Sequence, residues 1–259
     1  MIEQVSSIPL NTHLYIIDNS PHTEIGEHTD GSITRISTGR NLGYGKAHNL
    51  AIKRSLGLSK YHLISNTDIR FAGADIPTLL EKLESNDDVG MVAPRVRYPD
   101  GSLQHLCRIF PVPADLVAKR LFGWSRWGKA RVHRYELKGW KYDRAMEIPF
   151  LSGCFMLARR AVLEKTNGFD ERFFLYFEDL DLSRRMGMIS KTMFEPAVEI
   201  IHDYRSKNSK NRKLLLYLIV SGVRYFCKWG WIVDDYRTRV NRRTLDGLSR
   251  DGSFAERAS

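Results

Sequence analysis

Apolar and polar positions in the first two thirds of the chain alternate between two patterns. Short apolar runs that end in polar residues predict buried strands, as in HLYIIDNS at His13–Ser20 and YHLISNTD at Tyr61–Asp68. Between these runs, GYGKAHNLAIKRSLG has the spacing of a helix that stops at Gly57. Strands that alternate with helices favour an α/β layered domain built on a mostly parallel sheet.

Regularity is lost in the middle of the chain and returns later. Leu103–Pro149 mixes aromatic and basic residues without a clear period, which predicts an irregular, functional excursion. From Ser209 onward the pattern is helical and amphipathic. We therefore expect an α/β domain over residues 1–205 and a basic helical extension over residues 206–259. The other predicted elements are a helix at Asp75–Ser85, a strand at Val89–Pro94, a turn at Tyr98–Gly101, a strand leading into a helix that closes at Asn167–Gly168, a helix at Glu178–Met186, a short strand near Met193 and a strand at Ala197–Asp203.

Composition bounds the class of protein and names no function. Hydrophobic residues make up 42% of the chain and charged residues 27%, as in an ordinary soluble globular protein without repeats or low-complexity segments. The 40 Lys and Arg residues against 30 Asp and Glu give a net charge of +10. This balance favours anionic partners such as nucleic acid, acidic lipid headgroups or phosphorylated small molecules.

Cysteine usage and the apolar runs bear on the compartment. Three cysteines without a CxxC pair suggest neither a disulfide framework nor a zinc site, so a reducing, cytoplasmic compartment is expected. The first residues, MIEQVSSIPLNTH, lack the basic start and apolar stretch of a secretory signal. The longest apolar run, Leu214–Val223, falls short of the ~18 to 20 residues that a spanning helix needs.

Acidic and amide side chains follow two predicted strands. Asp18 ends the first strand and Asn66-Thr67-Asp68 end the second, at the carboxyl edge where open α/β sheets bind ligands. A nucleotide diphosphate needs a divalent cation held by one or two carboxylates, and Asp68 could supply one. Asp18 could accept hydrogen bonds from a base or ribose. Both segments are equally explained as polar turns.

Two glycines precede the first predicted helix in NLGYGKAHN, at Asn41–Asn49. Their backbone N–H groups and the positive end of the helix could approach a phosphate or ribose. A tight strand-to-helix turn explains the same pattern, which is not GxGxxG with a downstream acid.

The segment FFLYFEDLDLSRR gathers acids behind aromatic side chains. Aromatic surfaces could desolvate Asp179 and raise its pKa toward the range of a general base, with Glu178 beside it. Asp181 lies on another face, where an arginine can pair with it. The alternative is that these acids only stabilise a helix N-terminus. Further on, His202 follows an apolar strand and is either a metal or phosphate contact or a structural residue.

In this order, IIDNS, NLGYGKAHN, LISNTDI, FLSGCFMLARR, GFDERFFLYFEDLDLSRR and IIH resemble the bacterial family 2 glycosyltransferases, nearest the rhamnosyltransferase-like enzymes of surface polysaccharide synthesis. The match spans Leu14–His202. The resemblance implies a GT-A fold, an inverting single displacement, and a nucleotide-sugar donor bound with Mg²⁺ or Mn²⁺. It makes dTDP-rhamnose the expected donor and a polyprenyl-diphosphate-linked glycan, as in O-antigen synthesis, the expected acceptor.

Carried over by position, Asp18 matches the nucleobase-contacting aspartate of the family. Asn66-Thr67-Asp68 stands where the metal-binding Asp-x-Asp variant lies, which leaves Asp68 as the single carboxylate ligand, with His202 as a further metal candidate. Asp179, second of the pair with Glu178, matches the catalytic base. The remaining donor-side candidates are Asn41, Gly43, Asn49, Asn66 and Thr67.

One departure from the family concerns its first strand, of the form VSVVIVTYN, because this chain starts almost at the second. Without that strand, two others are expected to lose their shared neighbour and to expose unpaired edges, with a risk of aggregation. We expect weak donor binding by the chain as it stands. A catalytically impaired remnant, or a structural subunit of a glycan-assembly complex, is the corresponding alternative.

The basic aromatic segment Phe122–Trp140 and the tail RKLLLYLIVSGVRYFCKWGW suit an acceptor at the inner face of the cytoplasmic membrane. Peripheral association with an anionic membrane is therefore expected, and a tail helix packed on the domain is the alternative. A nucleic-acid-binding protein is a rival of another class, suggested by the net charge. It lacks a binding motif, so no nucleic-acid partner is expected.

Overall fold

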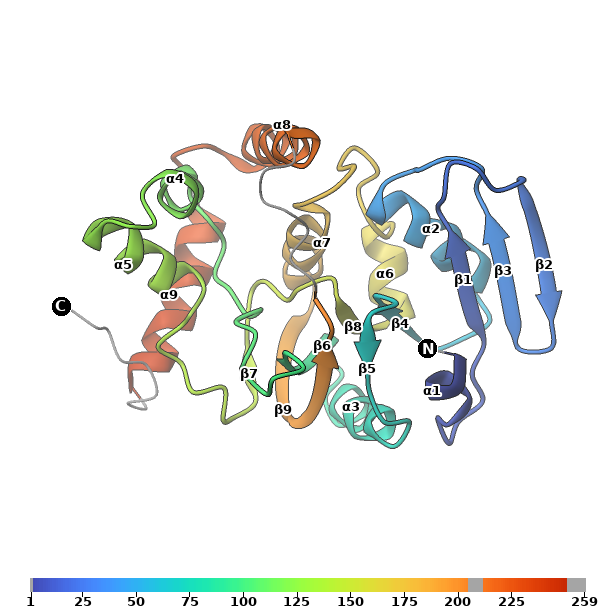
Figure 1. Cartoon of the computed structure of the whole chain (residues 1–259). Helices are drawn as coiled ribbons and strands as arrows, with labels where there is room; N and C mark the ends of the chain where they lie inside the picture. Colours follow the sequence, from blue (N-terminus) through green and yellow to red (C-terminus); the bar gives the residue numbers. More distant parts are fainter. Residues whose placement is uncertain (1, 205–211, 251–259) are drawn as a thin grey trace.

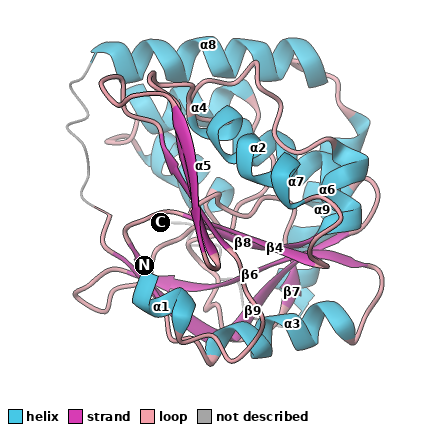
Figure 2. Cartoon of the chain, turned by 90° about the vertical axis from the view of Figure 1, so that its right-hand side faces the viewer, coloured by secondary structure: helices cyan, strands magenta, loops and turns pink. Residues whose placement is uncertain are grey.

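The computed structural model of the chain describes residues 2–204 and 212–250. Two β-sheets stand next to each other, with helices on both sides of the larger one (Figures 1 and 2). The predicted boundary at residues 205–206 and the last nine residues of the predicted extension lie outside the described residues. The division of the chain at that boundary stays a prediction.

The smaller sheet has the strand order β1-β3-β2. Its strands are β1 (Leu14–Asp18), β2 (Gly26–Asp30) and β3 (Ile33–Ser37), with β3 parallel to β1 and antiparallel to β2. The hairpin of β2 and β3 was not predicted. All of β2 is exposed, so its sequence GEHTD carries no apolar alternation to reveal a strand.

The larger sheet has the order β4-β8-β6-β9-β5, with β7 paired to β9. Among its described pairings only β6 and β9 run parallel, so the expectation of a mostly parallel sheet was wrong, although the α/β class with flanking helices is confirmed. One continuous β9 also replaces the two late strands that were predicted. The strands are β4 (Tyr61–Ser65), β5 (Ile69–Arg70), β6 (Val89–Arg97), β7 (Met146–Glu147), β8 (Phe155–Arg159) and β9 (Lys191–His202).

The strand directions place several chain segments at one edge of the larger sheet. Strand β8 runs antiparallel to β6, so the segment that connects them, residues 98–154, starts and ends at the same edge of the sheet. The register pairs Ser65 at the end of β4 with Phe155 at the start of β8, and Ile69 with His202 at the end of β9. The carboxyl ends of β4, β6 and β9 therefore lie beside the amino end of β8.

Helices cover both faces of the larger sheet (Figure 2). On one face, Leu79 and Leu83 of α3 (Asp75–Glu84) join a buried cluster with Val92 of β6. The short α1 (Ile2–Ser6) adds Val5 to this cluster. The other face is covered by α2 (Tyr44–Ser55), α6 (Arg160–Thr166) and α7 (Glu178–Gly187), which contribute Ile52, Leu163, Leu182 and Met186 to a second cluster.

The segment expected to be irregular contains two helices, α4 (Pro113–Leu121) and α5 (Arg126–Tyr135). Local caps start them: the Asp115 carboxylate accepts the Val112 N–H at 2.9 Å, and the Ser125 hydroxyl accepts the Gly128 N–H at 3.0 Å. These caps, rather than a long apolar period, define both helices, which explains why the hydrophobic pattern did not reveal them.

The end of the described chain forms α8 (Arg212–Trp229) and α9 (Asp235–Arg250), as the amphipathic pattern predicted. A buried ion pair, Arg184 with Asp234 at 2.6 Å, joins α7 to the start of α9. Neither these helices nor the others in the described ranges are long and apolar enough to cross a bilayer.

Both sheets end in an unpaired strand at the side where they face each other. Strand β1 is the last of the smaller sheet and β4 the last of the larger one, so no backbone ladder joins the sheets within the described residues. Helix α2 contacts both: it packs on β1, and the Ser55 hydroxyl lies 3.1 Å from His62 of β4. The expected pair of unpaired edges is thus confirmed.

Candidate active site

A strained turn presents the acidic pair at the start of α7. Tyr176 and Phe177 both have left-handed backbone conformations, with φ of 68° and 67°, which bulky residues rarely adopt. The helix begins immediately afterwards at Glu178. Asp179 is fixed by backbone donors: one carboxylate oxygen accepts the Gly153 N–H at 3.0 Å and the other the Leu180 N–H at 2.8 Å.

Gly153 and Cys154 connect this acid to the polar end of β4. The Tyr44 hydroxyl donates to the Gly153 carbonyl at 2.5 Å, and the Asn66 N–H donates to the Cys154 carbonyl at 2.9 Å. A Cβ at Gly153 would lie 3.0 Å from the Asp179 Cβ, so glycine allows the close approach. The segment before β8 thus lies between Asp179 and the predicted metal-binding segment.

Burial dominates the electrostatics of the acidic pair. It raises the pKa of Glu178 to about 8, and the neighbouring Asp179 adds to this shift. It also raises the pKa of Asp179, against the opposing effects of the Gly153 N–H and the Arg108 guanidinium. One Glu178 oxygen, Oε2, is buried without a hydrogen-bond partner. Burial and the repulsion between the two carboxylates therefore disfavour the state in which both are ionised.

Asp68 and His202 meet at the same edge of the sheet. The His202 Nε2 lies 3.3 Å from an Asp68 carboxylate oxygen, and its Nδ1 lies 3.0 Å from the Gln104 amide oxygen. Burial lowers the pKa of His202, which keeps its ring neutral. Apart from this Asp68 contact, the buried Nε2 has no hydrogen-bond partner among the described residues, so the two side chains fit a divalent cation whose remaining ligands come from elsewhere. Within the described ranges, no group of three or more His, Cys, Asp or Glu side chains could hold a metal.

The end of β1 leads into the glycine loop before α2. Asp18 accepts the Ser20 N–H at 3.0 Å, and hydrogen bonding from the Ser20 side chain first, and from this N–H second, lowers the pKa of Asp18. The Asn19 side chain holds the loop, accepting the Leu42 N–H at 2.8 Å and donating to the Gly43 carbonyl at 3.1 Å. Sequence reasoning missed Asn19, although its place between Asp18 and a turn was a usable signal.

Within that loop, Asn41 accepts the Gly43 N–H through its side chain at 2.9 Å. Gly43 has φ of 84°, and a Cβ there would lie 2.3 Å from the Phe174 carbonyl oxygen. That same carbonyl accepts the Tyr44 N–H at 2.9 Å. Gly43 therefore seats the start of α2 against the segment that leads to Asp179.

Two residues that the sequence analysis discussed, Asn49 and Asp181, make structural contacts inside the protein. Asn49 is buried, and its side-chain amide accepts the Phe169 N–H and donates to the Phe169 carbonyl. Contrary to the expectation, this side chain therefore does not face a nucleotide-sugar. Asp181 is fully buried and pairs with Arg185 and Lys228, each at 2.7 Å. Thr67 beside Asp68 is exposed.

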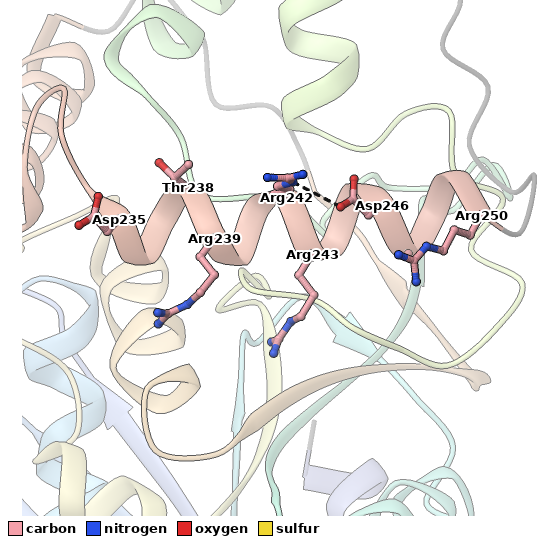
Figure 3. A pocket seen from close by; sticks show the side chains of 8 residues that line it. Asp235, Thr238, Arg239, Arg242, Arg243, Asp246 and Arg250 are labelled. Carbon is pink, nitrogen blue, oxygen red and sulfur yellow. Dashed lines mark ion pairs between the residues drawn. The ribbon is translucent and has the colours of Figure 1, made fainter.

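A separate open groove of about 630 Å³ lies along α9 (Figure 3). Its lining residues all come from that helix and include Arg239, Arg243 and Arg250, while Arg242 pairs with Asp246 at 3.6 Å. None of the acidic candidates described above contributes to it. This groove is therefore a basic surface feature, distinct from the carboxylates at the sheet edge.

Known proteins resemble this chain in sequence. N-acetylglucosaminyl-diphospho-decaprenol L-rhamnosyltransferase of Mycobacterium tuberculosis is 29% identical over 201 residues, which cover 71% of this chain and 62% of that protein. Rhamnosyltransferase WbbL of Escherichia coli is 28% identical over 184 residues, 67% of each chain. The chain thus spans about 62% of the length of the mycobacterial relative.

Solved structures share the fold at low sequence identity. The mannosyltransferase PcManGT of Pyrobaculum calidifontis, solved with GDP-Man and Mn²⁺, has a TM-score of 0.51 at 12% identity, covering 99% of this chain and 72% of the other. GalNAc-T7, solved with UDP, GalNAc and Mn²⁺, has a TM-score of 0.53 at 12% identity, covering 84% and 42%. Both are glycosyltransferases of the GT-A fold.

The family model for glycosyl transferase family 2 matches residues 2–166, well over half of the chain. Its match begins near the first residue and includes the strand ends that carry Asp18 and Asp68. The chain belongs to glycosyl transferase family 2.

Proposed function

We propose that this protein is an inverting glycosyltransferase that moves L-rhamnose from dTDP-rhamnose to a polyprenyl-diphosphate-linked glycan, as in O-antigen or other surface polysaccharide synthesis. The carrying observation is the half-buried Asp179 carboxylate, which two backbone N–H groups orient beside the end of β4. Relatives named as rhamnosyltransferases support the sugar, and the decaprenol named for the mycobacterial protein supports the lipid carrier.

Asp179 would act as the base of a single displacement. The acceptor hydroxyl oxygen attacks the anomeric carbon, its proton passes to the Asp179 carboxylate, and the bond from that carbon to the diphosphate oxygen breaks. Burial favours this role because it raises the pKa of Asp179. Glu178, with its pKa raised to about 8, stays largely protonated near neutral pH and so adds no second charge beside Asp179.

Donor binding would use the opposite side of the site. The Asp68 carboxylate and the His202 Nε2, which lie 3.3 Å apart, would hold Mg²⁺ or Mn²⁺, which when bound would neutralise charge on the departing diphosphate. Asp18 would accept hydrogen bonds from the nucleobase. Asn41, Gly43, Asn66 and Thr67 would line the path between them, while Asn49 supports it from within α2.

The decisive experiment compares Asp179→Asn with the parent protein in release of dTDP from dTDP-rhamnose and in sugar transfer. We expect both to fall by ~10²- to 10⁴-fold, the usual contribution of a general base. Asp87→Asn is the matched control, because the same change is made at a side chain that is 99% exposed. Equal rates for Asp179→Asn and the parent would refute the assignment. Loss of metal dependence in Asp68→Asn, with an unchanged circular dichroism spectrum, would support the cation site.

A second candidate, a catalytically impaired structural subunit, is favoured by the unpaired edges of β1 and β4. These edges separate Asp18 at the end of β1 from Asp68 in the turn that follows β4. Under this alternative the parent protein releases no dTDP at any donor concentration, and Asp179→Asn changes nothing. The same assay therefore separates the two functions.

The acceptor implies a location. A polyprenyl-linked glycan resides in a bilayer, so we propose that the protein works in the cytoplasm, peripherally at the inner face of the cytoplasmic membrane. The net charge of +10 supports attraction to anionic headgroups.

A further inference from the structure

Helix α8 carries an apolar stripe on its outer side. Leu216, Ile219 and Val223, spaced three and four residues apart, are 58%, 54% and 43% exposed. The inner side packs on the domain through the buried rings of Tyr225 and Phe226. An ordinary surface helix has one apolar side, which faces the core, so the second apolar stripe on the outer side of α8 marks a contact surface.

The loop after α8 extends this surface. Ile232 and Val233 are 89% and 79% exposed, and Trp231 is 44% exposed. We call the stripe of Leu216, Ile219 and Val223 together with Trp231, Ile232 and Val233 the docking face. Helix α8 lies along the outer boundary of the molecule in both views, and the loop continues from its end (Figures 1 and 2).

The loop is held in place despite its exposure. The Arg237 guanidinium, from the first turn of α9, donates to the Ile232 carbonyl at 3.0 Å and to the Gly230 carbonyl at 3.2 Å. The Trp231 ring lies 5.3 Å from the Phe226 ring. Because the backbone is already ordered, burial of Ile232 and Val233 in a partner would cost little conformational entropy.

The charge around the stripe identifies the kind of partner. Helix α8 contains no acidic residue, and its basic residues Arg212, Lys213 and Arg224 add to the surface charge, whereas Lys228 pairs inward with Asp170 and Asp181. Exposed aliphatic and indole side chains next to basic ones are the composition of elements that lie in the interface of an anionic bilayer. The face is an outward ridge, which a deformable lipid surface accommodates more readily than a rigid protein surface.

The inner side of α8 contacts the segment that leads to the acidic pair. The Tyr217 ring lies 4.6 Å from the Phe174 ring, and the Ser221 hydroxyl donates to the Leu175 carbonyl at 2.9 Å. A Cβ at Gly222 would lie 3.4 Å from the Phe177 ring. One helix, about 10 Å in diameter, thus separates the docking face from the turn that presents Asp179.

We propose that the docking face inserts into the headgroup region of an anionic bilayer and thereby sets the turn before Asp179 at the membrane surface, where a lipid-linked acceptor diphosphate lies. The acceptor part of this inference rests on the proposed function, whereas the lipid contact stands on the docking face itself. The face would also supply regulation, because α8 joins membrane contact to the position of the catalytic turn.

The test is flotation with vesicles of phosphatidylglycerol and phosphatidylcholine. We expect the parent to float with the anionic vesicles, and Ile232→Glu/Val233→Glu and Ile219→Glu/Val223→Glu each to lose at least ~10-fold in vesicle affinity. Leu58→Glu is the matched control, since Leu58 is 76% exposed in the turn that follows α2, and this variant should bind vesicles as the parent does. Circular dichroism checks that the variants are folded.

Two outcomes would overturn the proposal: vesicle binding by both double variants equal to that of the parent, or a parent that ignores vesicles but forms a dimer that the variants disrupt. Transfer to a water-soluble diphosphate acceptor without a long lipid tests the proposed function separately. The double variants should keep that activity. If neither the parent nor any variant transferred sugar to this acceptor, and only the double variants lost vesicle binding, the transferase assignment would be rejected. The proposal that the docking face binds membranes would still stand.

Discussion

The Gly153 N–H donates to the Asp179 carboxylate at 3.0 Å, across 26 positions of sequence. This bond joins the amino end of β8 to the first turn of α7. It orients the acid and opposes the rise in the pKa of Asp179 that burial causes. A backbone group therefore tunes the pKa of the proposed base.

Replacement of Gly153 by alanine should disturb this bond. The added Cβ would lie 3.0 Å from the Asp179 Cβ, so the carboxylate must shift by a few tenths of an ångström. We expect kcat to fall ~10- to 100-fold with little change in KM, because misplacement of a reacting group by about 1 Å costs on this scale. Steady-state kinetics measures kcat and KM for each variant. Gly26→Ala is the control, since a Cβ at Gly26 meets nothing within 4 Å. An equal fall in kcat in both variants would contradict the prediction.

The pH dependence of transfer should report on Asp179 and Arg108. The base must be ionised, so kcat/KM should decline as pH falls through the raised pKa of Asp179, which faces Arg108, Glu178, Tyr44 and Cys154. Arg108 lowers that pKa, so Arg108→Met should move the acidic limb to higher pH. A pH–rate profile of both proteins decides this. A limb that stays in place would remove Arg108 from the site.

Glu178 should make stability depend on pH. Burial raises its pKa from 4.5 to about 8 in the folded protein, so its favourable contribution is complete below 4.5 and is lost as pH rises through about 8. Glu178→Gln removes this loss. We therefore expect the melting temperature of the variant to exceed that of the parent at about pH 9, and the difference to shrink toward about pH 5. Scanning calorimetry at both pH values provides the measurement, and a difference that does not change with pH would contradict it.

Donor affinity should be low in the chain as it stands. Asp18 ends β1 and Asp68 lies in the turn that follows β4, and no backbone ladder holds these two strands at a fixed spacing. We expect Kd for dTDP-rhamnose with Mn²⁺ near 1 mM, about 4 kcal/mol of binding free energy. Titration calorimetry, with Asp68→Asn as the variant that should weaken binding further, gives the answer. Micromolar binding by the parent would show that the two sheets are already held in a binding geometry.

The positions of polar residues at the ends of strands could be predicted from sequence, because each of these residues follows a distinct apolar run. This placed Asp18, Asp68 and His202 at strand ends, and the acids of EDLD at a helix start. Their meeting depends on strand direction, which sequence did not reveal. The antiparallel course of β8 is what puts Gly153 between Asp68 and Asp179.

Other parts of the site lack any periodic signal. Asn19 acts through its side-chain amide on a loop 23 residues away, and Asn49 was assigned to a donor only as part of the segment NLGYGKAHN. Phe169, its actual partner, lies 120 residues further along the chain. Contacts between residues so far apart in sequence cannot be inferred from local pattern.

The absence of a ladder between β1 and β4 also divides the molecule into two cooperative units. The smaller sheet is tied to the rest by packing against α2 and by loops, so it can open without breaking the hydrogen bonds of the larger sheet. Amide protons in β1 and β3 should then exchange with solvent sooner than those in β6 and β9. A nucleotide that touches both units would slow that exchange, which makes hydrogen exchange a direct readout of whether the halves close around it.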